Sequence, residues 1–183
     1  MRFTIMELER EAIDFDESLA PGSIDFIEDV RQAGVLHTTG HVDLIREHRG
    51  PRDIVEDIRI RGSLDTRMEV TCARCLEPVE QQVEASFDLI FRPQDADVDG
   101  VDRSITASET EIGYYEGDGL LLEDVLREQI LLALPARILC SEGCKGLCAE
   151  CRRNRNQDPC DCAPASTDPR WSSLETIRSR VKQ

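Results

Sequence analysis

The sequence predicts an α+β protein: an antiparallel β-meander or hairpin sheet covered by a helix, then a cysteine-rich zinc-knuckle segment and a C-terminal helix. Three observations support this prediction: alternating apolar and polar residues within 58–91, a helical pattern within 121–134, and eight cysteines in close pairs. The length of 183 residues suits one domain with an appendage. We expect residues 1–136 to form an acidic α+β body with a cysteine hairpin at 72–75, and residues 137–183 to carry the zinc segment and the last helix.

The first 50 residues carry the weakest pattern, and short strands joined by loops are expected there. Four glycines interrupt any long element: Gly22, Gly34, Gly40 and Gly50. His37 and His41 are four residues apart, but Thr38 and Thr39 between them favour an extended or turning segment over a helix. No Glu lies between the two histidines, so the metalloprotease helix is excluded. We interpret them as solvated or hydrogen-bonded side chains.

Regular alternation begins near residue 58. The stretches 58–61, 64–72 and 79–91 each alternate apolar with polar residues, as strands with one wet face do. The last two stretches flank a Cys-x2-Cys segment, which predicts an antiparallel hairpin whose connection is a cysteine turn. A metal site at that turn must be completed by a segment that folds back, and the region around Cys140 is the candidate.

An acidic, Gly-rich stretch at 94–119 follows the hairpin. Its segment 95–100 begins like a calcium loop, but the twelfth position is Thr106 instead of the bidentate Glu. A solvated loop is therefore predicted.

Two helices are expected after this loop. Asp118-Gly119 is predicted to cap a helix that carries apolar residues within 121–134, ends at Pro135 and covers the buried face of the sheet. Asp168-Pro169 predicts the start of the last helix, because proline fits the first helical position.

The eight cysteines occur as four close pairs: Cys72/Cys75, Cys140/Cys144, Cys148/Cys151 and Cys160/Cys162. Four pairs are what two tetrahedral four-thiolate sites require, so about two zinc ions are predicted. A reducing compartment disfavours disulfides. The spacing from Cys144 to Cys151 matches the cluster motif of radical enzymes that use S-adenosylmethionine, but Glu150 stands where an aromatic is usual. The gaps also differ from a ferredoxin run, and a redox dithiol would leave the other cysteines unexplained.

The sequence permits three ways of joining these pairs into two sites. The eight residues between the third and fourth pairs close a loop at little entropic cost, which favours joining those two pairs. The first pair would then join the second. The rival arrangement exchanges the second pair with the third, and it remains open here.

Charge divides the chain into two regions. The net charge is −15, yet residues 1–136 hold 31 Asp and Glu against 13 Lys and Arg, whereas residues 137–183 hold 9 Lys and Arg against 6 acidic residues. Four basic residues surround the cysteine turns and are possible RNA contacts, or they neutralise the thiolates: Lys145, Arg152, Arg153 and Arg155. The acidic body suits a basic protein partner instead.

Several classes are disfavoured by what the sequence lacks. The N-terminus has no basic and apolar leader, and no apolar stretch reaches 18 residues, so we expect a cytoplasmic protein without membrane contact. With three histidines, no phosphate loop and no nucleophile motif, we expect no enzyme and no small-molecule substrate.

Five motifs together resemble the YceD family, the large ribosomal RNA subunit accumulation proteins. They are Cys72-Ala-Arg-Cys75-Leu, the helix end from Leu131 to Pro135, Cys144-Lys-Gly-Leu-Cys148, Cys160-Asp-Cys162 and Asp168-Pro-Arg-Trp171. The resemblance spans about residues 54–178, and it departs from the family pattern at Arg152, where Gly is usual. It implies a cytoplasmic protein of bacterial type that is needed for accumulation of large-subunit ribosomal RNA.

The resemblance and the residues together lead to one hypothesis and one alternative. The hypothesis is a non-catalytic, zinc-binding ribosome biogenesis factor, with large-subunit ribosomal RNA or its precursor as partner. The alternative is an acidic adaptor or chaperone that binds a basic ribosomal protein.

Overall fold

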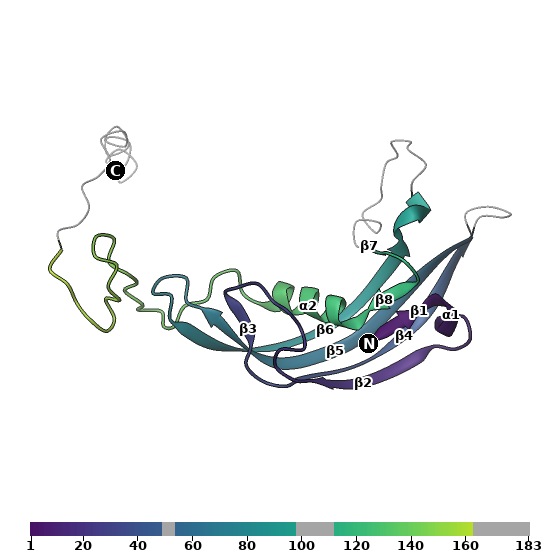
Figure 1. Ribbon diagram of the computed structural model, residues 1–183, viewed down its shortest axis with the longest axis horizontal. Helices are drawn as coiled ribbons and strands as arrows, with labels where there is room; N and C mark the ends of the chain where they lie inside the picture. Colours follow the sequence, from purple (N-terminus) through teal and green to yellow (C-terminus); the bar gives the residue numbers. More distant parts are fainter. Residues whose placement is uncertain (49–53, 98–111, 163–183) are drawn as a thin grey trace, which may run out of the picture. The chain divides into compact units, whose positions relative to one another are not determined.

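The computed structural model describes residues 1–48, 54–97 and 112–162 (Figure 1). The chain forms two units. Met1–Thr71 with Val79–Ala136 makes the sheet unit, and Cys72–Pro78 with Arg137–Gln183 makes the cysteine-rich unit, which is described as far as residue 162. The cysteine turn that connects two strands of the sheet therefore groups with the C-terminal segment.

The sheet unit contains most of the secondary structure. Its elements within the described ranges are β1 Arg2–Thr4, α1 Ile5–Leu8, β2 Ile13–Leu19, β3 Val30–Gln32, β4 Leu36–His48, β5 Ile54–Thr71, β6 Pro78–Pro93, the 3-10 turn η1 Gln94–Asp97, β7 Ile112–Tyr115, β8 Gly119–Leu121 and α2 Leu122–Ala133. The large sheet has the order β2-β4-β5-β6-β7, with β3 also paired to β5. The β2–β4, β3–β5 and β4–β5 pairs are antiparallel, whereas β6–β7 is parallel. The α+β class and the sheet are thus confirmed.

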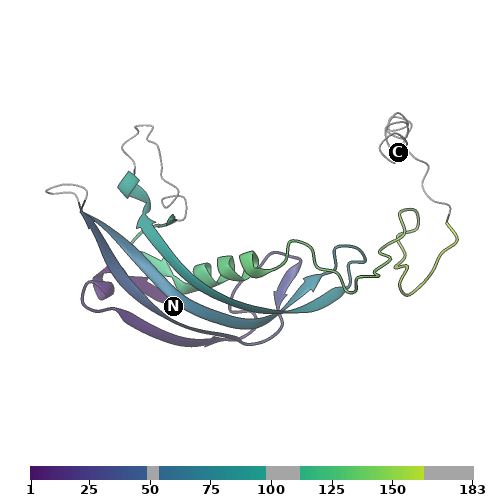
Figure 2. The same ribbon diagram turned by 180° about the vertical axis from the view of Figure 1, so that it is seen from behind.

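One face of the sheet packs against α2. Figures 1 and 2 view the molecule from opposite sides, and both show this helix lying against the curved sheet. Along β5 the predicted alternation holds, because Ile58, Ile60, Leu64 and Met68 are buried. They belong to one core cluster with four residues on one side of α2: Leu122, Val125, Leu126 and Ile130. Burial of these two apolar faces against each other holds the unit together.

Gly40, one of the glycines expected to interrupt elements, instead lies inside a long strand. Gly40 of β4 pairs with Gly62 of β5, so both strands continue through the glycine positions. A Cβ on Gly40 would lie 2.3 Å from the Arg61 carbonyl oxygen and 2.5 Å from the Phe15 ring. The prediction of short elements was wrong here, because these glycines let an aromatic ring approach the backbone closely.

The start of α2 also differs from the prediction. The residue before the helix is Leu121, which makes no side-chain cap, and Gly119–Leu121 forms β8 paired with β1. Asp118 accepts a hydrogen bond from Arg2 at 2.7 Å instead of capping the helix. Long-range pairing with the N-terminal strand has replaced the local cap.

The two histidines lie on a strand and contact polar side chains, in agreement with their interpretation from the sequence. His37 and His41 lie in extended β4, where His37 Nδ1 is 3.0 Å from Ser18 Oγ and His41 Nδ1 is 2.6 Å from Asp14. The helix predicted from Asp168 and position 106 of the acidic loop lie outside the described residues. No helix in the described ranges is long and apolar enough to cross a membrane.

Candidate metal centres

The first quartet consists of Cys72, Cys75, Cys140 and Cys144. Their four Sγ atoms lie within 4.8 Å of one another, with 3.9 Å between Cys72 and Cys144 and 3.5 Å between Cys75 and Cys140. Cys140 is exposed and the other three are buried. The region around Cys140 therefore completes the cysteine turn, in the arrangement that loop closure favoured.

Backbone hydrogen bonds build this turn. The Cys72 N–H donates to the Glu77 carbonyl at 2.8 Å, and the Leu76 N–H donates back to the Cys72 carbonyl at 3.0 Å. The Ala73 N–H donates to the carbonyl of Ile138, which brings in the second pair. Backbone N–H groups of Cys75 and Arg74 point at the Cys72 sulfur and lower its pKa to about 6. The backbone of this turn therefore favours the thiolate form of Cys72, which is the form that binds metal.

The second quartet consists of Cys148, Cys151, Cys160 and Cys162, and its Sγ atoms also lie within 4.8 Å of one another. It begins with the same kind of turn: the Arg152 N–H donates to the Cys148 carbonyl at 2.9 Å. Backbone N–H groups of Cys151 and Glu150 lower the pKa of Cys148 to about 6. Arg152 has φ 59°, the left-handed conformation that Gly adopts easily, so the departure from the family pattern leaves this turn intact.

Both quartets suit a tetrahedral thiophilic ion. Four sulfurs about 2.3 Å from zinc are separated by about 3.8 Å, close to the spacings found here. In the second quartet the thiols lie so close that hydrogen bonds to Cys151 and Cys160 raise the pKa of Cys162 to about 12. A bound divalent cation would hold all four sulfurs ionised, and the two quartets would supply every ligand.

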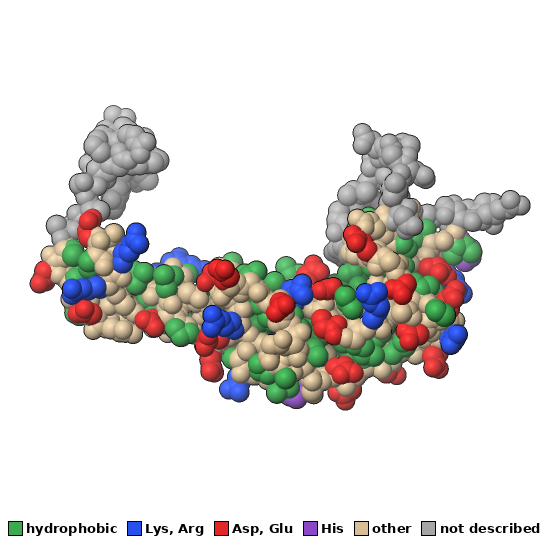
Figure 3. All heavy atoms as spheres, in the orientation of Figure 1, with side chains coloured by type: hydrophobic (Ala, Val, Ile, Leu, Met, Phe, Trp, Pro, Cys, Tyr) green, Lys and Arg blue, Asp and Glu red, His purple; other side chains and the backbone are tan. Residues whose placement is uncertain are grey.

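The four candidate RNA-contacting residues are all exposed on the cysteine-rich unit. Arg153 lies 3.4 Å from Asp158 in an ion pair, whereas Lys145, Arg152 and Arg155 have no ion-pair partner within the described residues. Figure 3 shows basic and acidic side chains exposed on both units, with many acidic side chains over the sheet unit.

Three side chains of the cysteine-rich unit contact the quartets or their turns but had no predicted role: Arg74, Asn154 and Asn156. Arg74 donates to the Cys144 carbonyl at 2.9 Å, and Asn156 donates to the Cys144 sulfur at 3.4 Å. The signal available was an Asn-x-Asn spacing inside the loop that the second quartet closes. Asn side chains commonly hydrogen-bond nearby backbone, so that spacing alone did not indicate a role at the other quartet.

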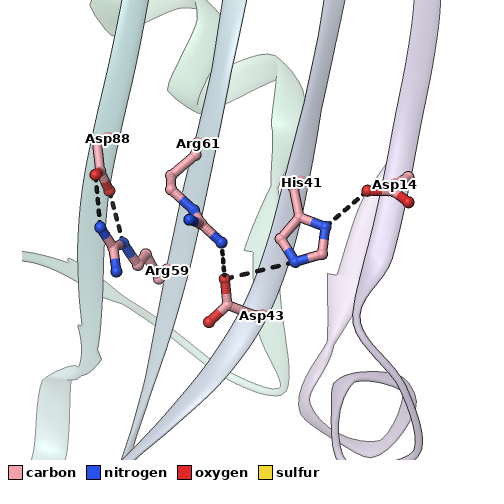
Figure 4. Close-up of polar contacts among 6 residues, drawn as sticks. All are labelled: Asp14, His41, Asp43, Arg59, Arg61 and Asp88. Atoms are coloured by element: carbon pink, nitrogen blue, oxygen red, sulfur yellow. Dashed lines mark hydrogen bonds and ion pairs between the residues drawn. The ribbon is translucent and has the colours of Figure 1, made fainter.

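Charges on the solvent-facing side of the sheet are largely paired. His41 lies between Asp14 and Asp43, and Asp43 also accepts from Arg61 at 3.1 Å (Figure 4). Arg59 contacts Asp88 through two hydrogen bonds of 2.8 and 2.6 Å. These residues lie on β2, β4, β5 and β6, which are neighbours in the sheet (Figure 4). Arg59 and Arg61 are therefore engaged with carboxylates of the protein itself.

Comparison with known proteins identifies the family to which the chain belongs. Residues 60–178 match the family model described as large ribosomal RNA subunit accumulation protein YceD. This match covers more than half of the chain. The chain belongs to the YceD family. Its matched region contains both cysteine quartets.

Curated relatives of this YceD chain include bacterial and plant proteins. Uncharacterized proteins of Mycobacterium tuberculosis and Mycobacterium bovis are 26% identical over 172 residues, covering 85% of this chain and 80% of each relative. A chloroplastic protein of Arabidopsis thaliana, named large ribosomal RNA subunit accumulation protein YCED homolog 1, is 24% identical over 163 residues. That match covers 78% of this chain and 49% of the plant protein, so the chain spans about half its length. No solved structure matches the chain.

Proposed function

We propose that this YceD protein is a non-catalytic ribosome biogenesis factor that binds two zinc ions and supports accumulation of large-subunit ribosomal RNA. Membership of the family supports the connection with ribosome biogenesis. The observation that carries the zinc proposal is the gathering of all eight cysteines into two quartets. In both, zinc would act as a structural cross-link, since four protein ligands leave no position for a substrate.

Metal analysis tests the zinc proposal directly. Protein purified without chelator is expected to carry about two zinc ions per chain. Cys72→Ser and Cys148→Ser should each empty a different site, so each single variant loses one ion and the double variant loses both. Less than one zinc per chain, with about eight titratable thiols, would contradict the proposal. A shared loss, in which either substitution releases the same ion, would contradict the quartets.

Contact with ribosomal RNA is assigned to the basic side chains beside the quartets. Lys145, Arg152 and Arg155 are exposed and without an ion-pair partner among the described residues, which leaves them available for phosphates. Replacing all three by alanine should weaken binding to large-subunit RNA and reduce its salt slope by about two. Arg67→Ala is the matched control, because Arg67 is exposed on the sheet unit and only 3.9 Å from Glu80. An equal effect in the control would mean that RNA binds elsewhere.

The second candidate function is an acidic adaptor for a basic ribosomal protein. The observation that favours it is the acidic excess of residues 1–136, of which the pairing of Arg59 and Arg61 with Asp88 and Asp43 neutralises only a part. Crosslinking in cells, followed by RNA sequencing and protein identification, separates the two candidates. Recovery of large-subunit RNA through the cysteine-rich unit supports the first, and recovery of a basic protein without RNA supports the second.

A further inference from the structure

Two asparagines in the loop closed by the second quartet contact the first quartet. We propose that Asn154 and Asn156 are positioning residues that couple the two metal centres, so that metal held by Cys148, Cys151, Cys160 and Cys162 strengthens metal binding by Cys72, Cys75, Cys140 and Cys144. The inference rests on the proposed zinc binding. It adds an energetic coupling between the two sites, and by linkage metal in either site strengthens binding in the other.

Asn156 contacts the first quartet on both sides of its amide. Its Nδ2 donates to the Cys144 sulfur at 3.4 Å, and its Oδ1 accepts from the Lys145 backbone N–H at 2.8 Å. The amide therefore binds one ligand atom and the backbone next to it. A hydrogen bond to a thiolate stabilises its charged form, which is the form that binds metal.

Asn154 holds Asn156 in place and reaches the other half of the first quartet. Its Oδ1 accepts from the Asn156 backbone N–H at 3.0 Å and from the Asn156 side-chain amide at 2.9 Å. Its Nδ2 donates to the Glu77 carboxylate at 2.9 Å. Glu77 closes the first cysteine turn through its backbone carbonyl. The two asparagines thus span both halves of the first quartet.

The second quartet determines whether these amides are held in position. Both asparagines lie between Cys151 and Cys160, in a segment without any buried side chain. Its backbone bonds to the preceding turn near its beginning, where the Cys148 N–H donates to the Arg153 carbonyl at 2.9 Å and the Arg155 N–H donates to the Gly146 carbonyl at 3.0 Å. Further along, the backbone bonds only within the segment, from Gln157 and Asp158 to the Asn154 carbonyl. Metal shared by the cysteines at its two ends would close the loop. Without that closure, ordering the amides costs conformational entropy that the first site must supply.

A four-variant comparison measures the coupling. Zinc affinity of the first site is measured by competition with a chromophoric chelator, in the wild type and in Cys160→Ser/Cys162→Ser, which empties the second site. We expect the loss of the second site to weaken the first by about 10- to 100-fold, the range for groups that support metal ligands. In an Asn156→Ala background, the same two serines should change first-site affinity by less than about threefold, because the coupling contact is already absent.

Controls separate coupling from damage to the fold. Gln157→Ala is the matched variant, since Gln157 also contacts Glu77, at 3.3 Å, but makes no contact with a first-quartet sulfur. It should keep the coupling. The absorption spectrum of bound Co²⁺ should remain that of four thiolates in Asn156→Ala, which shows that the ligand set is intact.

The outcomes also distinguish this inference from the proposed function. Two bound zinc ions, with first-site affinity unchanged when the second site is emptied, would overturn the coupling and leave zinc binding in place. Persistence of the coupling in Asn156→Ala would overturn the role of the asparagines. A wild-type protein that binds no metal would overturn both proposals.

Discussion

At the scale of single residues, Leu76 and Arg152 adopt a conformation that side chains with a β-carbon seldom take. Their φ angles are 62° and 59°, and each follows the second cysteine of a Cys-x2-Cys turn. Each N–H donates back to the carbonyl of the first cysteine, at 3.0 and 2.9 Å. The turn that directs two sulfurs to one point therefore imposes a left-handed residue, whichever side chain stands there.

Leu76→Gly is predicted to stabilise the first quartet. A residue with a side chain in the left-handed conformation destabilises the folded state by roughly 1–2 kcal/mol. Glycine removes this strain, but its greater freedom in the unfolded chain offsets about 0.5–1 kcal/mol of the gain. Leu76 is 62% exposed, so little packing is lost. We expect a net gain of up to about 1 kcal/mol, measured as resistance of the zinc-loaded protein to denaturant. Loss of stability would show that the Leu76 side chain makes a contact that the glycine cannot replace.

At the scale of elements, the paired strands β4 and β5 depend on close approach at their glycines. Gly40→Ala should destabilise the sheet unit by about 1–3 kcal/mol, because the new methyl group would overlap the Arg61 carbonyl and the Phe15 ring. Gly143→Ala is the matched control, since its Cβ would meet nothing within 4 Å. Chemical denaturation of the two variants compares them. Equal stability would mean that the Phe15 ring moves aside without cost.

A cross-strand ion pair predicts a dependence on pH. Arg59 on β5 holds the pKa of Asp88 on β6 below its ordinary value, mainly through hydrogen bonding. Because the folded pKa is lower than the unfolded one, the stabilisation is present above the usual Asp pKa near 4 and is lost as pH falls through the folded pKa.

Asp88→Asn should therefore be slightly less stable than the wild type at pH 7, with the difference disappearing at acidic pH. The pair is exposed, so the effect at pH 7 is small. Denaturant midpoints at pH 7, 5 and 3, with chelator present throughout, exclude any contribution from metal release. A difference that stays constant with pH would mean that the carboxylate charge is not the cause.

At the scale of the whole molecule, different interactions stabilise the interior of each unit. The sheet unit has an extended apolar core. In the described part of the cysteine-rich unit, residues 72–78 and 137–162, the buried residues are Ile138, Gly146 and four cysteines, Cys72, Cys75, Cys144 and Cys148. Structural zinc contributes roughly 10–16 kcal/mol in small zinc domains, comparable to the net stability of a domain. We therefore expect the cysteine-rich unit to depend on bound metal for its shape.

Removal of metal should unfold the cysteine-rich unit and spare the sheet unit. Hydrogen exchange with and without chelator is expected to show loss of protection within 137–162, whereas β4, β5 and α2 stay protected. Equal loss across β5 and β6 would show that the first quartet supports the entire fold. Unchanged protection everywhere would show that the cysteines hold no metal.

Features that depend on neighbouring residues could be predicted from the amino-acid sequence. Alternation along β5 and β6 and the apolar side of α2 follow from the periods of strand and helix. The short gaps within cysteine pairs, and the short loop before Cys160, favoured the quartets by local closure.

Only the tertiary structure decided what depends on residues far apart in the chain. The cap expected at Asp118 became part of β8 once β1 paired with it, and Gly40 lies inside a strand because Phe15 packs over it. Arg92 is buried against Asp57, 2.9 Å away, although an arginine on a strand reads as exposed. Asn156 reaches Cys144 only after the chain folds back. Such contacts form when the core and the metal turns close, and no local period encodes which partners meet there.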